Sequence, residues 1–186
     1  VTSFEASFSE FSGAPHSVAV SSCTAGLHLF YLAIGVGAGD EVIVPAQTHT
    51  ATAHAVEYTG ARAVFADVHA VTGNILIEEI EKKLTSKSKG IIPVHMAGYP
   101  CDINEIIKIC DLYNLVLIED CAHALGSTFN GKKCGSIGDL GCFSFYPTKI
   151  ITTGEGGMIP TNSSQLNKKI IQLRSHGMSH LPQDRE

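Results

Sequence analysis

The chain has 186 residues, enough for one domain with a sizeable hydrophobic core. Hydrophobic residues make up 44% of it and charged residues 17%, which is typical of a folded globular protein and not of a disordered one. A net charge of −5 without any basic run argues against nucleic acid and anionic membranes as partners. No apolar stretch approaches the roughly twenty residues that a membrane-spanning helix needs.

The sequence opens on Val1 without a secretory signal pattern, and we expect it to be a fragment of a longer protein. Its six cysteines form no CxxC pair and lie in or beside apolar segments, as reduced thiols do in a cytoplasmic protein. Its nine histidines include no pair with the spacing of a zinc site, so we expect no structural metal.

Hydrophobic periodicity and turn signals predict alternating helices and strands. In chain order we expect a helix at 3–12, a strand at 17–21, a helix at 24–34, a strand at 41–44, a helix at 49–58 and a strand at 62–67. A helix at 75–84, a strand at 90–94, a helix at 103–113 and strands at 115–119, 141–145 and 156–161 follow. A last helix is expected at 163–174, capped by Ser163 or Ser164, and Asn130-Gly131 predicts a hairpin turn.

Strands that alternate with helices and are apolar throughout predict an α/β fold, with a mostly parallel sheet covered by helices on both faces. Ligands of such sheets bind just outside the carboxyl ends of the strands. Polar segments fall at or just past these ends, namely residues 21–23, residues 46–49, Asp67, Asp120 and the loop that holds Lys149. We therefore expect the candidate site residues to converge on one edge of the sheet.

The most informative segment runs from Phe143 to Met158 and places Lys149 between an apolar, hydroxyl-rich stretch and a glycine-rich turn. A desolvated lysine amine is more easily neutral and nucleophilic. Upstream, the apolar run 115–118 ends in Glu119-Asp120. A buried strand that ends in a carboxylate, with a lysine beyond it, suits a pyridoxal-phosphate site: Lys149 would hold the aldehyde as a Schiff base, and Asp120 would keep the pyridine nitrogen protonated. Taken alone, a single lysine is more often an ordinary surface residue.

The remaining candidates each have a plain structural alternative. Small residues at 21–26 would let a phosphate approach the start of a helix, and Ser144 would add a hydroxyl or bond to the backbone as a core serine. His49 would stack on a flat cofactor or cap its helix, and His123 would reach the same ligand or a backbone carbonyl. Side chains alternate along a strand, so Glu119 is expected to point to the face opposite Asp120.

Two other binding motifs are rejected. Residues 126–133 nearly match a P-loop, but a lysine stands where serine or threonine would hold magnesium, and residues 122–125 separate the motif from the preceding strand. The first strand is not followed by GxGxxG, which argues against dinucleotide binding.

Six ordered blocks of the sequence resemble the DegT/StrS family of pyridoxal-phosphate sugar aminotransferases, and the resemblance runs over essentially the whole chain. The blocks are SCTAGLHL at 22–29, GDEVIVPAQT at 39–48, GARAVFADV at 60–68, PVH at 93–95, IEDCAHA at 118–124 and FSFYPTK at 143–149. The resemblance implies fold-type-I architecture, in which residues 1–186 form the large domain that binds pyridoxal 5'-phosphate. It also implies a C-terminal small domain that this sequence lacks.

The resemblance assigns roles to individual residues. Lys149 matches the Schiff-base lysine and Asp120 the aspartate at the pyridine nitrogen, so these two are the expected catalytic residues. The other expected cofactor contacts are His123 near the ring hydroxyl, His49 at the stacking position, Thr24 and Ala25 in the backbone phosphate clamp, and Ser144 as a hydroxyl contact to the phosphate. Cys23 stands where many members have glycine, so an ordinary backbone conformation is expected there.

The activity implied by the resemblance is transamination of a nucleotide-linked ketosugar with glutamate as donor. The family's setting is cytoplasmic synthesis of precursors for surface polysaccharides or glycosylated metabolites, and the full-length protein is expected to be a homodimer. Two alternatives on the same fold stay open. One is a sugar dehydratase, whose members replace the lysine with histidine, so that Lys149 disfavours it. The other is a non-catalytic cofactor-binding regulator, which the intact Lys149, Asp120 and Ser144 disfavour.

Overall fold

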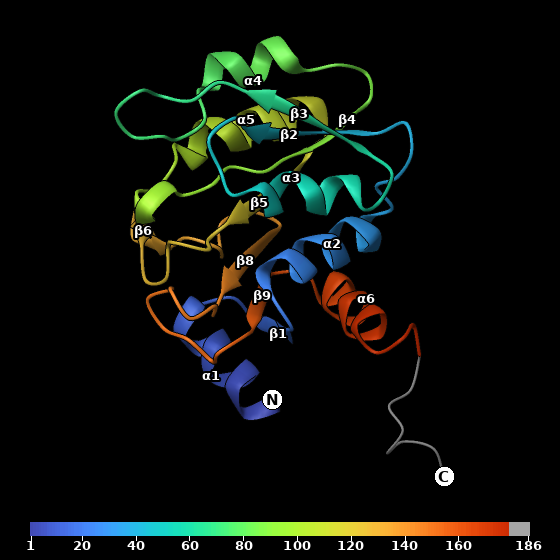
Figure 1. Ribbon diagram of the computed structural model, residues 1–186, viewed down its shortest axis with the longest axis vertical. Helices are drawn as coiled ribbons and strands as arrows, with labels where there is room; N and C mark the ends of the chain where they lie inside the picture. Colours follow the sequence, from blue (N-terminus) through green and yellow to red (C-terminus); the bar gives the residue numbers. More distant parts are fainter. Residues whose placement is uncertain (179–186) are drawn as a thin grey trace.

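A seven-stranded sheet organises residues 1–178, the part of the chain that the computed structural model describes (Figure 1). Its strands are β1 (His16–Val20), β2 (Glu41–Pro45), β3 (Arg62–Ala66), β4 (Ser88–Ile91), β5 (Val116–Asp120), β8 (Leu140–Ser144) and β9 (Gly157–Thr161), in the spatial order β1-β9-β8-β5-β4-β2-β3. Strand β9 runs antiparallel to both β1 and β8, and the other neighbouring pairs are parallel. The carboxyl ends of all strands but β9 therefore share one edge with the amino end of β9.

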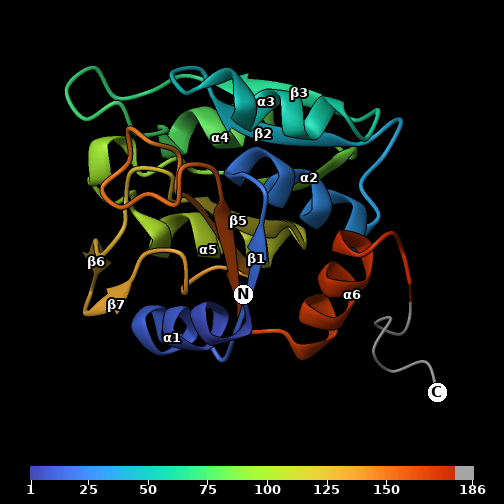
Figure 2. The same ribbon diagram turned by 60° about the horizontal axis from the view of Figure 1, so that its bottom comes forward.

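Helices cover both faces of the sheet, as the alternating pattern predicts (Figure 2). They are α1 (Thr2–Ser12), α2 (Cys23–Ile34), α3 (Thr50–Glu57), α4 (Ile77–Lys83), α5 (Ile103–Tyr113), α6 (Ser164–Arg174) and a short 3-10 helix, η1 (Met96–Gly98). Helices α2, α3 and α6 share one apolar cluster with the sheet, α4 and α5 share a second, and α1 packs Phe4 and Phe8 into a third. None of the described helices is both long and apolar enough to cross a membrane.

Local sequence signals explain most of the element ends. The Ser163 hydroxyl accepts a hydrogen bond from the N–H of Leu166 and caps α6, which confirms the predicted cap. Two short strands, β6 (Thr128–Phe129) and β7 (Lys132–Lys133), pair around Asn130 and Gly131, whose φ angles of 50° and 79° fit the predicted hairpin turn.

One strand is shorter than the sequence predicts. Apolar residues continue to Val94, but β4 ends at Ile91 because Pro93 offers no N–H to a neighbouring strand. The chain returns to the sheet only as a single bridge between Val94 and Asp120, in which the N–H of His95 donates to the carbonyl of Asp120 at 3.1 Å. This bridge joins the segment before η1 to the end of β5, the position that the sequence predicts for the site. The short helix η1 itself was not expected from the sequence.

Candidate active site

A cavity of about 470 Å³ lies at the shared edge of the sheet. Six of the seven predicted site residues line it: Thr24, His49, Asp120, His123, Ser144 and Lys149. They come from the start of α2, the start of α3, the end of β5, the end of β8 and the loops that follow these strands. The convergence expected from parallel strands is therefore present, with two exceptions, Ala25 and Asp67.

The two exceptions lie away from the cavity for different reasons. Ala25 lies in the first turn of α2, where its N–H donates to the hydroxyl of Ser22 at 3.1 Å, and it borders a separate depression together with His28. Asp67 is exposed after β3, the edge strand, and its carboxylate accepts from the N–H of the next residue at 2.8 Å. Strand β3 lies four places from β8 in the strand order, at the edge opposite β1, so its end does not reach the cavity and the expected convergence fails for Asp67.

Asp120 is the carboxylate at the end of β5, and it is only 5% exposed. Its Oδ1 accepts from the N–H of Ala122 at 3.0 Å, and its Oδ2 accepts from the hydroxyl of Thr52 at 2.9 Å. An ionised carboxylate has about four acceptor positions, so lone pairs remain for a ligand in the cavity. Asp120 is therefore held in place by the protein and still available to a cationic N–H group.

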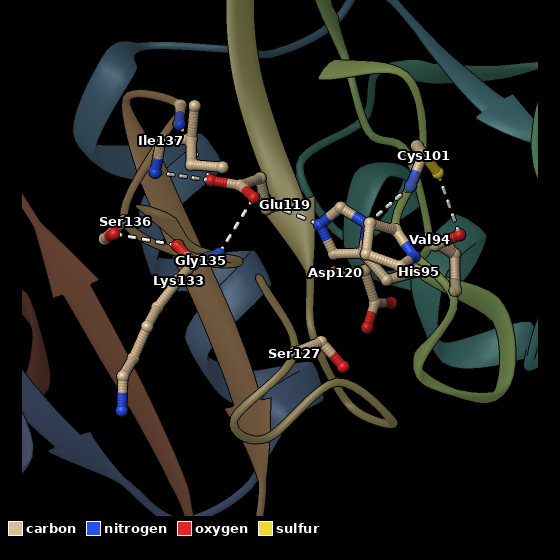
Figure 3. Close-up of polar contacts among 12 residues, drawn as sticks. Val94, His95, Cys101, Glu119, Asp120, Ser127, Lys133, Gly135, Ser136 and Ile137 are labelled. Atoms are coloured by element: carbon tan, nitrogen blue, oxygen red, sulfur yellow. Dashed lines mark hydrogen bonds and ion pairs between the residues drawn. The ribbon is translucent and has the colours of Figure 1, made fainter. Parts of the chain in front are cut away.

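Glu119, the residue before Asp120, points to the other face, as period-two alternation predicts (Figure 3). It is fully buried. Its Oε1 accepts from the N–H groups of Ile137 and Gly138 at 2.8 and 2.7 Å, and its Oε2 from the N–H of Gly135 at 2.8 Å. The ring of His95 completes the set at 3.0 Å. Glu119 thus ties the loop before β8 and the segment after β4 to the end of β5.

The same buried cluster has the composition of a metal site, but two of its three residues already use their donor atoms in hydrogen bonds. Donor atoms of His95, Glu119 and Cys121 lie within 4.8 Å of one another. However, the backbone N–H of Cys101 donates to Nδ1 of His95 at 3.0 Å, and both oxygens of Glu119 already accept two hydrogen bonds each. A metal ion would have to displace these bonds, so we assign these groups to holding the strand end together.

The start of α2 borders the cavity and offers backbone N–H groups to it. The first N–H groups of any helix lack partners within the helix, and they attract anions. Thr24 and Cys23 line the cavity at this point. Cys23 is the first residue of α2, so its backbone is the ordinary one expected from the sequence, and its Sγ lies 3.4 Å from that of the buried Cys142.

Both histidines expected at the site line the cavity, and His49 combines the two alternatives weighed from the sequence. Nδ1 of His49 accepts from the N–H of Ala51 at 3.1 Å and caps α3, yet the same residue lines the cavity. Burial lowers the pKa of His123, and the nearby positive charge of Lys149 lowers it further, while Asp120 acts in the opposite direction. An imidazole whose pKa lies below its ordinary value of about 6.5 is mostly neutral near pH 7.

Lys149 and Ser144 lie at and beyond the end of β8. Lys149 belongs to the loop between β8 and β9 and is half-buried, which is less desolvated than the sequence suggests. Ser144 accepts from the N–H of Tyr146 at 3.4 Å and also lines the cavity, so its backbone contact and its candidate role coexist.

Sequence reasoning missed several lining residues, and Thr52 is the most important of them. It lies in the first turn of α3, is 1% exposed, and donates to Asp120. Within the helix expected at 49–58, spacing from His49 was the available signal, because residues three apart share a helix face. Glu155 also lines the cavity, because the antiparallel β9 begins at this edge of the sheet.

Comparison with known proteins places these features in a family. A sequence model of the DegT/DnrJ/EryC1/StrS aminotransferase family matches residues 1–186. GDP-perosamine synthase of Caulobacter vibrioides is 45% identical over 178 residues, which make up 96% of this chain and 48% of that relative. The solved aminotransferase from Psychrobacter cryohalolentis is 43% identical, with a TM-score of 0.93 over 97% of this chain and 48% of its own.

A solved GDP-4-keto-6-deoxymannose-3-dehydratase with a trapped PLP-glutamate geminal diamine is also similar, at 33% identity and a TM-score of 0.90 over 96% of this chain and 48% of its own. These similarities confirm the predicted fold class. The chain spans about half the length of the relatives it matches.

Proposed function

The chain belongs to the DegT/DnrJ/EryC1/StrS aminotransferase family, and on that premise we propose that it is the cofactor-binding half of a pyridoxal-phosphate-dependent nucleotide-sugar aminotransferase. The observation that carries the proposal is the cavity that brings Lys149, Asp120 and the start of α2 together. We further propose that residues 1–186 form the large domain and that a small domain lies in further sequence, because the relatives are about twice as long.

The residues of the cavity fit pyridoxal phosphate. Its phosphate needs an anion site, which the N–H groups at the start of α2 and the hydroxyl of Ser144 would provide. Its pyridine nitrogen needs a buried acceptor, and Asp120 is a nearly buried carboxylate with lone pairs left for the cavity. Its aldehyde needs a primary amine, and Lys149 supplies one.

When bound, the cofactor supplies an electron sink for a carbanion at a carbon next to nitrogen. The chain's own residues do the rest. Asp120 would hold the proton on the pyridine nitrogen, the ring of His49 would cover one face of the cofactor, and the neutral His123 would lie near its ring hydroxyl. The amine of Lys149, once free, would carry a proton between the α carbon of the amino donor and the C4′ atom of the cofactor.

The substrate and donor in this proposal are supported by what the relatives are named for. The Caulobacter relative is a GDP-perosamine synthase, which supports a nucleotide-linked ketosugar as amino acceptor. A Bacillus subtilis relative is named as a spore coat polysaccharide biosynthesis protein, which supports a role in polysaccharide synthesis. The dehydratase was trapped with glutamate, which supports glutamate as donor. The six cysteines are free and buried, as is usual in a reducing compartment, which supports a cytoplasmic location. We also propose that the whole protein works as a homodimer.

Borohydride reduction tests where the cofactor is attached. The protein is loaded with pyridoxal phosphate, reduced, digested and mapped by mass spectrometry, and we expect the pyridoxyl group on Lys149. Lys149→Ala should lose the label, whereas the control Lys133→Ala should keep it, because Lys133 lies in the hairpin away from the cavity. Labelling at Lys132 or Lys133 in the unmodified protein would contradict the proposal.

Product analysis then separates the alternatives on this fold. The whole protein is incubated with pyridoxal phosphate, glutamate and a nucleotide-linked 4-ketosugar, and we expect an aminosugar together with 2-oxoglutarate. A deoxygenated sugar without amine would indicate a dehydratase. A label on Lys149 without any turnover in the whole protein would indicate a cofactor-binding regulator.

A further inference from the structure

A short chain of hydroxyl groups leads from the cavity to the buried side of Asp120. The Thr52 hydroxyl donates to Oδ2 of Asp120 at 2.9 Å, and the hydroxyls of Thr48 and Thr52 lie 2.8 Å apart. Thr52 is 1% exposed and Asp120 is 5% exposed, so water competes little for this bond. Both threonines also line the cavity.

The direction of the hydrogen bonds follows from the chemistry of the three groups. An ionised carboxylate only accepts, so Thr52 must donate its single hydroxyl proton to Asp120. Its oxygen can then only accept from Thr48, which makes Thr48 the donor of the 2.8 Å bond. The lone pairs of Thr48 are left for the cavity, where they would accept from a ligand hydroxyl or from water.

Thr52 does not use its hydroxyl as threonines in helices often do. Such hydroxyls usually bond to a backbone carbonyl one turn earlier. In α3 the backbone N–H of Thr52 donates to the carbonyl of His49 at 3.1 Å, whereas its hydroxyl donates to Asp120. The Thr52 side chain thus reaches across from α3 to Asp120 in β5, which is 68 residues later in the sequence.

We propose that Thr52 is a positioning residue of this site, whose hydroxyl fixes the rotamer of Asp120, so that the free lone pairs face the cavity. Thr48 orients the Thr52 hydroxyl from the outer side. With Ala122 donating to Oδ1 and Thr52 to Oδ2, the carboxylate plane is fixed at both oxygens. The inference rests on the proposed function, in which Asp120 serves the pyridine nitrogen.

A double-mutant cycle in the cofactor-free protein tests the Thr52–Asp120 bond without any catalysis. Thr52→Val keeps the shape and removes the donor, and Asp120→Asn removes the charge. We measure urea unfolding of the unmodified protein, the two single variants and the double variant. The cycle then gives the coupling between Thr52 and Asp120, as the difference between the effects of Thr52→Val with and without Asp120→Asn. Bonds to charged groups contribute enough for Thr52→Val to lower the folding equilibrium constant about tenfold or more when Asp120 is intact. In the Asp120→Asn background we expect Thr52→Val to lower the folding equilibrium constant about threefold or less.

Thr52→Ser and Thr59→Val are the matched variants. Serine keeps the hydroxyl, so Thr52→Ser should restore the coupling. Thr59, just after α3, donates its hydroxyl to a backbone carbonyl at 2.7 Å and is no part of the cavity lining. Thr59→Val should therefore show no coupling to Asp120→Asn. Equal losses from Thr52→Val in both backgrounds would overturn the proposed bond.

Steady-state kinetics of the loaded whole protein test the consequence for the site. We expect Thr52→Val to lower kcat about tenfold with KM for the amino donor changed less than about threefold, and Thr52→Ser to regain most of kcat. Normal kcat in Thr52→Val, in a protein that transaminates and is labelled on Lys149, would overturn the positioning role and leave the proposed function intact. Absence of transamination would count against the proposed function alone, since the cofactor-free cycle still decides the Thr52–Asp120 bond.

Discussion

Replacing Glu119 by glutamine should strongly destabilise the protein, although the two side chains have nearly the same shape. Glu119 is 0% exposed and accepts four hydrogen bonds, two at each oxygen. A glutamine amide can accept on its oxygen side only. Its NH₂ group must face either the N–H groups of Ile137 and Gly138 or those of Gly135 and His95, so donors meet donors in either rotamer.

The size of the effect follows from those lost bonds. Two buried donors lose their acceptor, and each unsatisfied buried group costs about 1–3 kcal/mol. Removing one partner from a buried, hydrogen-bonded charged set typically costs about 3–5 kcal/mol. We therefore expect Glu119→Gln to lower the free energy of unfolding by about 3–5 kcal/mol, a large part of the roughly 5–15 kcal/mol that domains have in total.

Urea unfolding followed by circular dichroism at 25 °C measures this difference. Glu105→Gln is the matched control, because Glu105 lies on α5 with its side chain 45% exposed and pairs only with Lys108 among the interactions of the described residues. Exposed pairs of this kind contribute about 0–1 kcal/mol. A loss below about 1 kcal/mol for Glu119→Gln would refute the view that this carboxylate fastens the loop before β8, given what buried charged sets normally cost.

Two further predictions concern the cavity wall. Because the pKa of His123 is lowered in the folded protein, the unfolded chain binds more protons as the pH falls below about 6.5, and stability is lost toward the folded pKa. Unfolding free energies at pH 7 and pH 5.5 should therefore differ less in His123→Gln than in the unmodified protein; an unchanged or larger difference would count against the assigned shift. Gly157→Ala should lower the thermal midpoint by several degrees and weaken pyridoxal-phosphate binding, because its Cβ would lie 2.7 Å from the backbone nitrogen of Cys23. Gly37→Ala provides a comparison for stability alone, because Gly37 is not in the left-handed region and an added Cβ would meet only the carbonyl oxygen of Thr59, at 3.8 Å. Unaltered cofactor affinity in Gly157→Ala would contradict the proposed phosphate site.

The location of the site was predictable because it depends on strand direction and little else. Apolar strands alternating with helices require a mostly parallel sheet, and the residues after such strands share an edge. Lys149, Asp120 and His49 follow different strands and were placed together on that ground, and they do line one cavity. Asp67 follows a strand in the same way but lies on the sheet's outer edge, and strand order is not written in local periodicity.

The supporting contacts of the site were not predictable, because they depend on how elements pack in three dimensions. Period-two alternation sends Glu119 away from Asp120, but it does not say that a loop of residues 135–138 turns its N–H groups toward that carboxylate. Helical spacing puts Thr52 on the face of His49, the residue that caps α3, but only the approach of α3 to β5 brings its hydroxyl to Asp120. Such bonds join residues far apart in sequence and need the folded backbone.

The reversed direction of β9 explains why glycine stands at position 157, the first residue of the strand after the loop that carries Lys149. Because β9 is antiparallel to β1 and β8, its amino end, and not its carboxyl end, reaches the edge where the cavity lies. Gly157 begins the strand, and a side chain there would collide with the backbone of Ser22 and Cys23, each 2.7 Å from the Cβ position. The start of α2, where the phosphate is proposed to bind, can therefore lie directly against β9 only because this residue is glycine. One residue thus couples the loop that carries Lys149 to the proposed anion site, and a change there should disturb both.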